Sequence, residues 1–294
     1  MTDFRPRRSA LYIPGSNKRA LEKARGLAAD VVILDLEDAV APQGKIEARD
    51  NIAEAFAAGF GDREVVIRVN SLDTPWGEGD LAFCATVNPD AVLVPKVGSA
   101  GTVMALARGL EKLGIAERTR VWAMVETPLA ILNVATIASV AQDPASRLSC
   151  LVMGTNDLLK DSRMRAVAGR ANLVPWLSMA VAAARAYSLT VLDGVFNAFD
   201  DAEGFAAECR QGADFGFDGK TVIHPSQISP ANEIFAPGAE EVSRARAILE
   251  AFALPENAEA GVLSLNGQMV ERLHAEIARQ TVVIAEAIER KQNS

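Results

Sequence analysis

Two carboxylates that could bind one metal ion stand just beyond two consecutive apolar runs. Glu126 directly follows Val121–Val125, and Asp157 comes shortly after Leu151–Met153. If these runs are neighbouring parallel strands, both carboxylates lie at one rim of the sheet, where waters and substrate oxygens would complete a usual Mg2+ site. Mn2+ suits the same oxygen ligands. The alternative is that Glu126 pairs with Lys96 and that Asp157 caps a helix.

An arginine is expected beside a group of acids. Arg68 lies in the apolar run Val65–Val69, and a guanidinium there can hold a carboxylate or enolate oxygen through two parallel hydrogen bonds. Asp35, Glu37 and Asp38 follow another apolar run, and three acids so close together require a cation nearby. We therefore expect Arg68 to pair with Glu37 or Asp38 in addition to binding substrate.

Other polar residues offer weaker signals. Backbone N–H groups of Gly154, Thr155 and Asn156, at a predicted helix start, could bind a carboxylate. Lys220 and His224 lie around the last strand, and such residues can form a Schiff base or act as a base. Lys220 precedes the apolar part of that strand and His224 is followed by proline, so a structural role is predicted for both.

Eight short β-type apolar runs would position these residues. Their spacing of roughly 20 to 40 residues is typical of βα units, and in a (β/α)8 barrel the carboxyl ends of the strands meet at one mouth, where active sites lie. The runs are Ala10–Ile13, Val31–Leu34, Val65–Val69, Ala91–Val94, Val121–Val125, Leu151–Met153, Val191–Leu192 and Thr221–Ile223. The predicted fold class is therefore α/β, a (β/α)8 TIM barrel.

Helical patterns alternate with the runs. The clearest are Lys45–Ala58 and Leu177–Tyr187, and Ser16 is the predicted N-cap of the first helix.

The C-terminal segment changes character. It shows a helical pattern over Glu240–Phe252, then a turn-rich stretch through Asn266-Gly267, then a second helical pattern over Val270–Lys291. We predict a catalytic barrel over residues 1–237 and a helical extension over 238–294 that acts as a lid.

The composition is that of a globular protein with an ample core. Of 294 residues, 49% are hydrophobic and 23% charged, which suits one large domain. The net charge of −8 disfavours nucleic acid as a partner, because a basic surface is needed to gather phosphates. Three cysteines without a C-x-x-C pair indicate neither a disulfide framework nor a zinc site, and no apolar run suits a signal peptide or a membrane span. A cytoplasmic protein without a membrane partner is expected.

Seven motifs in series resemble one family. They are Arg8–Ser16, Leu34–Val40, Arg68–Asn70, Pro95–Val97, Glu126–Thr127, Gly154–Leu158 and Gly219–Pro225. In this order they resemble the citrate lyase beta-subunit-like group of the HpcH/HpaI aldolase superfamily over nearly the whole chain. The resemblance implies an Mg2+-dependent barrel that acts on CoA thioesters such as malyl-, methylmalyl-, citramalyl- or citryl-CoA. It also implies a homo-oligomer, a trimer or hexamer, in which the C-terminal segment covers a neighbouring subunit's site.

The resemblance assigns roles to individual residues. Glu126 and Asp157 would hold Mg2+, while Arg68 would bind the oxygen that becomes the enolate or carbonyl. Cleavage of a 3-hydroxyacyl thioester builds negative charge on the thioester oxygen and needs a base for the hydroxyl proton, so a cation at that oxygen suits the chemistry. A divalent ion would lower the pKa of the hydroxyl.

Further roles come from the same resemblance. Glu37 and Asp38 would support Arg68 and the metal waters, close to the reaction. Tyr12 and Lys23 match positions that approach the CoA in relatives.

The extension departs from the pattern of the family's lyases, in which a Gly-x-x-Val-Asp motif supplies a catalytic carboxylate to the adjacent site. Here Gly267–Val270 is followed by Glu271. The extra methylene moves the carboxylate by about one carbon–carbon bond, and near-attack geometry is sensitive to shifts of about 1 Å. The sequence Val-Glu-x-Leu-His looks more like the branch of (3S)-malyl-CoA thioesterases, where a longer carboxylate would activate water. The alternative role of Glu271 is a solvated acid at a helix start.

Two reactions therefore remain open. One is carbon–carbon cleavage of malyl-CoA-type thioesters to acetyl- or propionyl-CoA and a glyoxylate-type 2-oxo acid. The other is hydrolysis of the same thioester to malate and CoA. A subunit like citrate lyase beta, which needs an acyl-carrier partner, is a further alternative. A CoA-independent 2-oxo-acid aldolase is disfavoured, because Asn17–Arg25 and Lys45–Asp50 contain no histidine to act as base.

Overall fold

The structure is a computed structural model that describes residues 4–257 and 259–292. The chain divides into two compact units, one formed by Arg7–Asn232 and the other by the residues from Glu233 on, together with those before Arg7. This division falls a few residues before the boundary predicted after residue 237.

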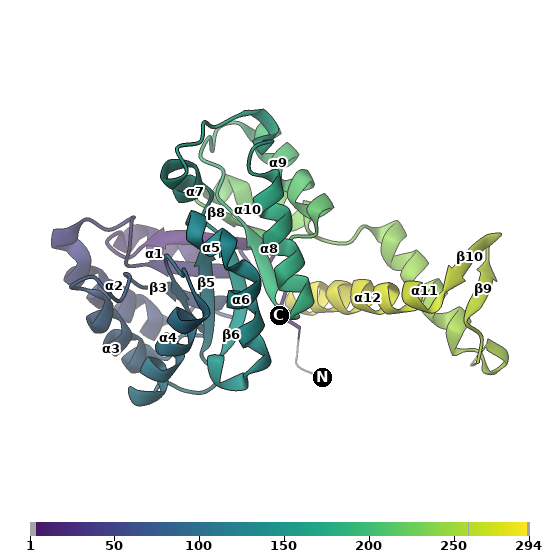
Figure 1. Cartoon of the computed structure of the whole chain (residues 1–294), viewed down its shortest axis with the longest axis horizontal. Coiled ribbons are helices and arrows are strands. Elements are labelled where there is room, and N and C mark those ends of the chain that lie inside the picture. Colours follow the sequence, from purple (N-terminus) through teal and green to yellow (C-terminus); the bar gives the residue numbers. More distant parts are fainter. Residues whose placement is uncertain (1–3, 258, 293–294) are drawn as a thin grey trace. The chain divides into compact units, whose positions relative to one another are not determined.

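The first unit is a closed barrel of eight parallel strands in sequence order (Figure 1). The strands are β1 (Ser9–Pro14), β2 (Val31–Asp35), β3 (Glu64–Arg68), β4 (Ala91–Val94), β5 (Arg120–Val125), β6 (Leu148–Met153), β7 (Thr190–Asp193) and β8 (Gly219–Val222). Pairing of β1 with β8 closes the ring, with Ala10 opposite Thr221. The predicted (β/α)8 barrel is confirmed, and each predicted apolar run overlaps one strand.

The strands are buried on both faces, as expected for a parallel sheet covered by helices. Every residue of β2 and β3 is buried. Side chains that point into the barrel form one cluster, in which Trp122 and Ile33 are fully buried and Tyr12 packs at the edge. The barrel interior is thus a packed core, and the chemistry is left to its rim.

Helices surround these strands. They are α1 (Lys18–Ala24), α2 (Lys45–Ala58), α3 (Gly77–Val87), α4 (Ala100–Lys112), α5 (Pro128–Leu132), α6 (Val134–Ser139), α7 (Thr155–Asp161), α8 (Val174–Ala186), α9 (Ala202–Phe215) and α10 (Ile228–Ile234).

Two predicted helix caps are wrong. The N-cap of α1 is Asn17, whose side chain accepts a hydrogen bond from the backbone N–H of Ala20, and not Ser16. The N-cap of α7 is Gly154, so Asp157 lies inside the first turn of the helix and does not cap it. An acid in that turn is still favoured by the helix dipole.

The second unit contains α11 (Ala239–Ala253), the hairpin of β9 (Val262–Leu265) and β10 (Gln268–Glu271), and α12 (Arg272–Gln292). Asn266 and Gly267 connect the two strands with φ of 52° and 78°, as a type I′ turn requires. The predicted helix start at Val270 is wrong, because Val270 and Glu271 end a strand and the helix begins at Arg272.

Apolar residues of this hairpin and the two helices form their own core. Val270 is almost fully buried against Ile248 of α11 and Ala275 of α12, with Leu263 at the edge. The core explains why a short two-stranded ribbon is stable here, since an isolated hairpin is marginal in water.

Within residues 4–257 and 259–292, no helix combines the length and apolar character that crossing a membrane requires. Cys84, Cys150 and Cys209 are buried and free. Burial raises the pKa of each thiol, which keeps the thiols protonated and unreactive.

Candidate active site

Parallel pairing brings the carboxyl ends of the strands to one mouth. Asp35, the last residue of β2, lies in register with Arg68, the last residue of β3. Pro14 of β1 stands opposite Asp35 on the other side. The end of β5 is followed by Glu126, and that of β6 by Gly154. The predicted polar residues of these strands therefore share one rim.

Arg68 is held by acids on two sides. Its Nε and Nη2 donate to the two carboxylate oxygens of Asp35 at 2.7 and 2.6 Å. Its Nη1 lies 2.7 Å from Glu37 Oε2, an ion pair that lacks hydrogen-bond alignment, and 3.5 Å from Asp38 Oδ2. The predicted ion pair with Glu37 or Asp38 is present, and Asp35 is the closer partner.

The arginine is also stacked and buried. Its guanidinium lies over the ring of Tyr12, 4.8 Å from the centroid, and Arg68 is 7% exposed. Burial alone would lower the pKa of Arg68, but the charges of Asp35, Tyr12 and Glu37 raise it well above its ordinary value. Arg68 is therefore a fixed positive charge with a defined orientation.

Two residues to which the sequence analysis assigned no role shape the loop after β2. Lys45, at the start of α2, donates from Nζ to the carbonyl oxygens of Leu36 and Glu37 at 3.0 and 2.9 Å. Asn70 donates to the Leu36 carbonyl at 2.8 Å. These bonds fix the backbone that presents Glu37.

Glu126 is buried at the rim and has no side-chain cation partner in the described part of the chain. Its Oε1 accepts a 2.6 Å hydrogen bond from the backbone N–H of Lys96, so the expected alternative of an ion pair with the Lys96 side chain is wrong. Lys96 has a φ of 54°, a left-handed conformation that non-glycine residues adopt rarely and that is concentrated at functional sites.

Gly154 leaves the space that Glu126 fills. A Cβ atom added at Gly154 would overlap the Cβ of Glu126 and approach its Oε2 to 2.6 Å. Glycine is therefore required by the close approach of two strand ends.

Negative charge accumulates around Glu126. Burial, with the charges of Glu37 and Asp157, raises the pKa of Glu126 to about 7. Burial also raises the pKa of Glu37 to about 7; Arg68 opposes this shift, and Asp38 and Asp35 add to it. Such a site favours a bound cation, since a positive charge there would relieve the repulsion.

Asp157 faces the same rim from the first turn of α7. Its Oδ1 accepts from Lys160 Nζ at 3.0 Å, but the Lys160 side chain is 70% exposed, so the pair contributes little stability and can open. Among the described residues no group of three or more His, Cys, Asp or Glu could hold a metal ion. Two carboxylates, those of Glu126 and Asp157, would suit Mg2+, which keeps several waters.

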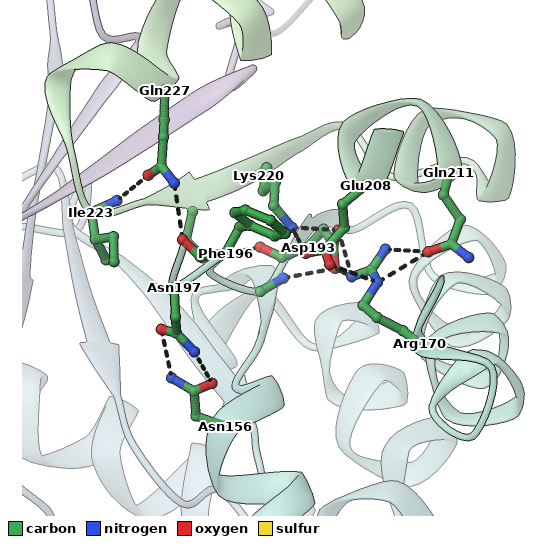
Figure 2. A network of polar contacts seen from close by, with 12 residues as sticks. Asn156, Arg170, Asp193, Phe196, Asn197, Glu208, Gln211, Lys220, Ile223 and Gln227 are labelled. Carbon is green, nitrogen blue, oxygen red and sulfur yellow. Dashed lines mark hydrogen bonds and ion pairs between the residues drawn. The ribbon is translucent and has the colours of Figure 1, made fainter. Parts of the chain in front are cut away.

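The start of α7 is joined to the loop after β7. Asn156, predicted to bind substrate, exchanges two hydrogen bonds with the amide of Asn197 (Figure 2). The side chain of Thr155 lies against the backbone of Gly194, where an added Cβ would come within 2.5 Å of Thr155 Oγ1. Sequence reasoning assigned no role to Asn197 or Gly194.

Below this loop lies a buried charged cluster. Lys220 Nζ donates to Asp193 at 2.8 Å and to Glu208 at 2.7 Å, and Arg170 Nη1 donates to both oxygens of Asp193 (Figure 2). Lys220 has no exposed surface. These contacts agree with the predicted structural role of Lys220.

The remaining predicted residues lie elsewhere. Lys23 is exposed in the last turn of α1 and has no contact with the acids described above. His224 caps a short 3-10 helix and stacks on Phe199, in agreement with a structural role. Glu271 belongs to the second unit, where its backbone N–H donates to His274 Nδ1 at 2.9 Å.

Known proteins resemble this chain over nearly its whole length. The family model described as HpcH/HpaI aldolase/citrate lyase matches residues 8–225. A (3S)-malyl-CoA thioesterase of Cereibacter sphaeroides is 48% identical over 96% of both chains. An L-malyl-CoA/beta-methylmalyl-CoA lyase of the same organism is 34% identical over 96% of this chain and 95% of its own. The crystal structure of protein CitE from Mycobacterium tuberculosis, in complex with magnesium, acetoacetate and coenzyme A, is 30% identical, with a TM-score of 0.74 over 96% of this chain and 98% of that chain.

Proposed function

The chain belongs to the HpcH/HpaI aldolase/citrate lyase family, and from this premise we propose that it hydrolyses a malyl-CoA-type thioester with the help of Mg2+. The proposal rests on the arrangement at the mouth of the barrel. Arg68, at the end of β3, and the buried Glu126, just after β5, lie at the same rim. A thioester carbonyl and a metal ion both need such groups. Hydrolysis is supported by the higher identity to the thioesterase than to the lyase.

The residues present fit a magnesium ion. Glu126 and Asp157 would hold it through carboxylate oxygens, and the backbone N–H of Lys96 would keep one oxygen of Glu126 in place. When bound, the ion supplies positive charge to substrate oxygens and lowers the pKa of a hydroxyl or water beside it. Support comes from the charge balance of the site and from the magnesium in the CitE complex.

Arg68 would bind the oxygen of the thioester carbonyl. Two of its nitrogens are occupied by Asp35, so the orientation of the guanidinium is set before substrate arrives, and the Nη1 edge, which already faces Glu37 and Asp38, would be shared with the ligand. Hydrogen bonds to an oxygen that gains charge strengthen as the reaction proceeds. Glu37 and Asp38 would keep that edge in place, and Thr155 and Asn156 would contact the substrate carboxylate through backbone N–H groups.

The water-activating base in this proposal is Glu271. Glu271 is the last residue of β10, a strand of the C-terminal hairpin. We propose that the C-terminal segment works as a lid in a homo-oligomer, a trimer or hexamer, and delivers Glu271 to a neighbouring subunit's mouth. Tyr12 and Lys23 are proposed to contact the CoA portion, and the protein is proposed to be cytoplasmic.

Carbon–carbon cleavage of the same thioester is the second candidate. The lyase relative matches 96% of this chain, and the groups at the mouth suit the developing enolate as well as they suit hydrolysis. A role like that of a citrate lyase beta subunit, with an acyl-carrier partner, is a variant of this candidate.

The test is turnover of (S)-malyl-CoA by the purified chain with Mg2+. Free CoA would be followed with a thiol reagent, and malate, acetyl-CoA and glyoxylate by chromatography. Free CoA with malate is the expected result. Formation of acetyl-CoA and glyoxylate would show that the enzyme cleaves the carbon–carbon bond and does not hydrolyse the thioester. Full activity in EDTA would overturn the metal requirement.

A further inference from the structure

We propose that Asn197 is a positioning residue for the metal site, acting through its amide pair with Asn156; this inference rests on the proposed function. Asn197 lies in the loop between β7 and α9 and touches neither Glu126 nor Asp157 through any contact of the described residues. Its side chain forms hydrogen bonds with Asn156, the residue that precedes Asp157 in the first turn of α7 (Figure 2).

The amide pair is reciprocal. Asn197 Nδ2 donates to Asn156 Oδ1 at 2.8 Å, and Asn156 Nδ2 donates to Asn197 Oδ1 at 3.3 Å. Both side chains are exposed, and the two hydrogen bonds between their planar amides run in opposite directions, which orients one amide relative to the other. The pair therefore restrains the turn of backbone between Gly154 and Asp157.

The loop that carries Asn197 is itself held on a rigid base. Gln227, which is 2% exposed, donates from Nε2 to the Phe196 carbonyl at 2.9 Å and accepts from the backbone N–H of Ile223 at 2.9 Å. One residue before Asn197 is thus tied to the segment after β8. Because the loop is anchored in this way, the amide of Asn197 can hold Asn156 in a fixed position.

The start of the loop is anchored as firmly. Asp193 accepts from Lys220 and Arg170, and its Oδ1 also accepts from the N–H of Gly194 at 2.8 Å. Gly194 in turn packs against Thr155. Two consecutive residues in the first turn of α7 therefore contact the loop after β7. Thr155 packs on Gly194, and Asn156 forms hydrogen bonds with Asn197.

Asp157 needs such support. Its carboxylate has only the exposed Lys160 as a side-chain partner among the described residues, whereas Glu126 is fixed by burial and by a backbone N–H. Partners behind a metal ligand are worth 10–100-fold in metal affinity or activity in other sites. Because the Asp157 side chain has no buried partner among the described residues, the Asn156–Asn197 amide pair is the contact that would hold this turn of the helix in position.

The experiment measures Mn2+ binding to the full chain by electron paramagnetic resonance, without substrate. Asn197→Ala should weaken binding by about tenfold. Asn156→Ala should do the same, and the double variant should be no weaker than either single variant, because both remove one contact. Asn172→Ala is the control, since Asn172 Nδ2 also donates one hydrogen bond, to the Arg165 carbonyl, in the loop after α7.

Two results would overturn the inference. One is Mn2+ binding by Asn197→Ala as tight as that of the wild type and of Asn172→Ala. The other is losses that multiply in the double variant, which would mean that each residue acts by itself. Thermal unfolding of each variant shows that the fold is retained. If Asp157→Asn leaves Mn2+ binding unchanged, the proposed metal site fails and this inference with it, whereas failure of Asn197→Ala alone leaves the proposed function standing.

Discussion

Asp35 and Arg68 end two adjacent strands in register, and their side chains close a bidentate pair with bonds of 2.7 and 2.6 Å. A pair between strand ends is more rigid than one between loops, because both backbones belong to the barrel. The pairing of β2 with β3 therefore determines the orientation of the Arg68 guanidinium.

Arg68→Lys should lower kcat for the thioester about a hundredfold, because an ammonium cannot keep the fork on Asp35 and also present a second edge to substrate. Steady-state kinetics on (S)-malyl-CoA would measure the loss. Arg25→Lys is the control, since Arg25 is an exposed arginine that donates to the carbonyls of Ala58 and Gly59. A purely structural role for Arg68 would appear as lost stability with kcat unchanged.

Asp157→Asn should weaken Mg2+ activation at least tenfold with the fold retained, because the variant keeps the size of the side chain and removes the charge of a ligand. The Mg2+ dependence of the rate is the measurement. Asp161→Asn provides a matched control in the same helix, as Asp161 also pairs with Lys160, at 3.6 Å. Equal losses in both variants would point to helix electrostatics and away from a metal ligand.

Gly154→Ala should reduce turnover about a hundredfold or more, because the added Cβ overlaps Glu126 and must displace it, and displacements of about 1 Å cost about that much. Gly238→Ala is the control, since its Cβ would meet nothing within 4 Å. Activity in Gly154→Ala equal to that of the control would show that the position of Glu126 does not matter to the reaction.

Glu271→Asp should change the ratio of hydrolysis to cleavage, since the shorter side chain withdraws the carboxylate by about one carbon–carbon bond. Product analysis by chromatography gives the ratio. Glu276→Asp, an exposed acid of α12, serves as the control. A ratio that stays constant in Glu271→Asp would show that this carboxylate does not select the reaction.

Asp193→Asn should destabilise the folded barrel by about 3 kcal/mol at pH 7, because it removes one of the two carboxylates that Lys220 and Arg170 share and leaves only Glu208 to balance two buried cations. Burial raises the pKa of Asp193, but Lys220 and Arg170 lower it by more, so it lies below its ordinary value. The carboxylate therefore stabilises the fold above about pH 4, and this contribution is lost as the pH falls through the folded pKa.

Urea unfolding at pH 7 and pH 3 tests the direction of this pH dependence. The difference between wild type and Asp193→Asn should shrink at pH 3, while Asp200→Asn, which changes an exposed carboxyl, should differ little at either pH. A difference that grew on acidification would contradict the lowered pKa.

The barrel was predictable because its signal is local. Each strand is a short apolar run, and residues at the ends of parallel strands share a rim whatever the loops do. The pairing of Arg68 with acids was predictable from charge density alone, although the closest partner, Asp35, was distinguished from Glu37 only by the register of β2 and β3.

Backbone conformation and distant pairing were not predictable in the same way. Nothing in the sequence announces that Lys96 adopts a positive φ, or that Asn156 meets Asn197 from 41 positions away. The hairpin had a signal, since Asn266-Gly267 between alternating apolar residues is typical of a type I′ turn. The helical spacing that starts at Val270 obscured it.

The bond from Lys96 to Glu126 uses the main chain of one residue and the side chain of the other. Its two ends therefore tolerate change very differently. Position 96 can exchange its side chain for any that accepts a left-handed backbone, with glycine and asparagine the easiest, and the donor survives, whereas proline removes the donor altogether. At position 126 the side chain itself accepts the hydrogen bond, so a substitution there removes or alters the acceptor. The same interaction therefore tolerates substitution at position 96 but not at position 126.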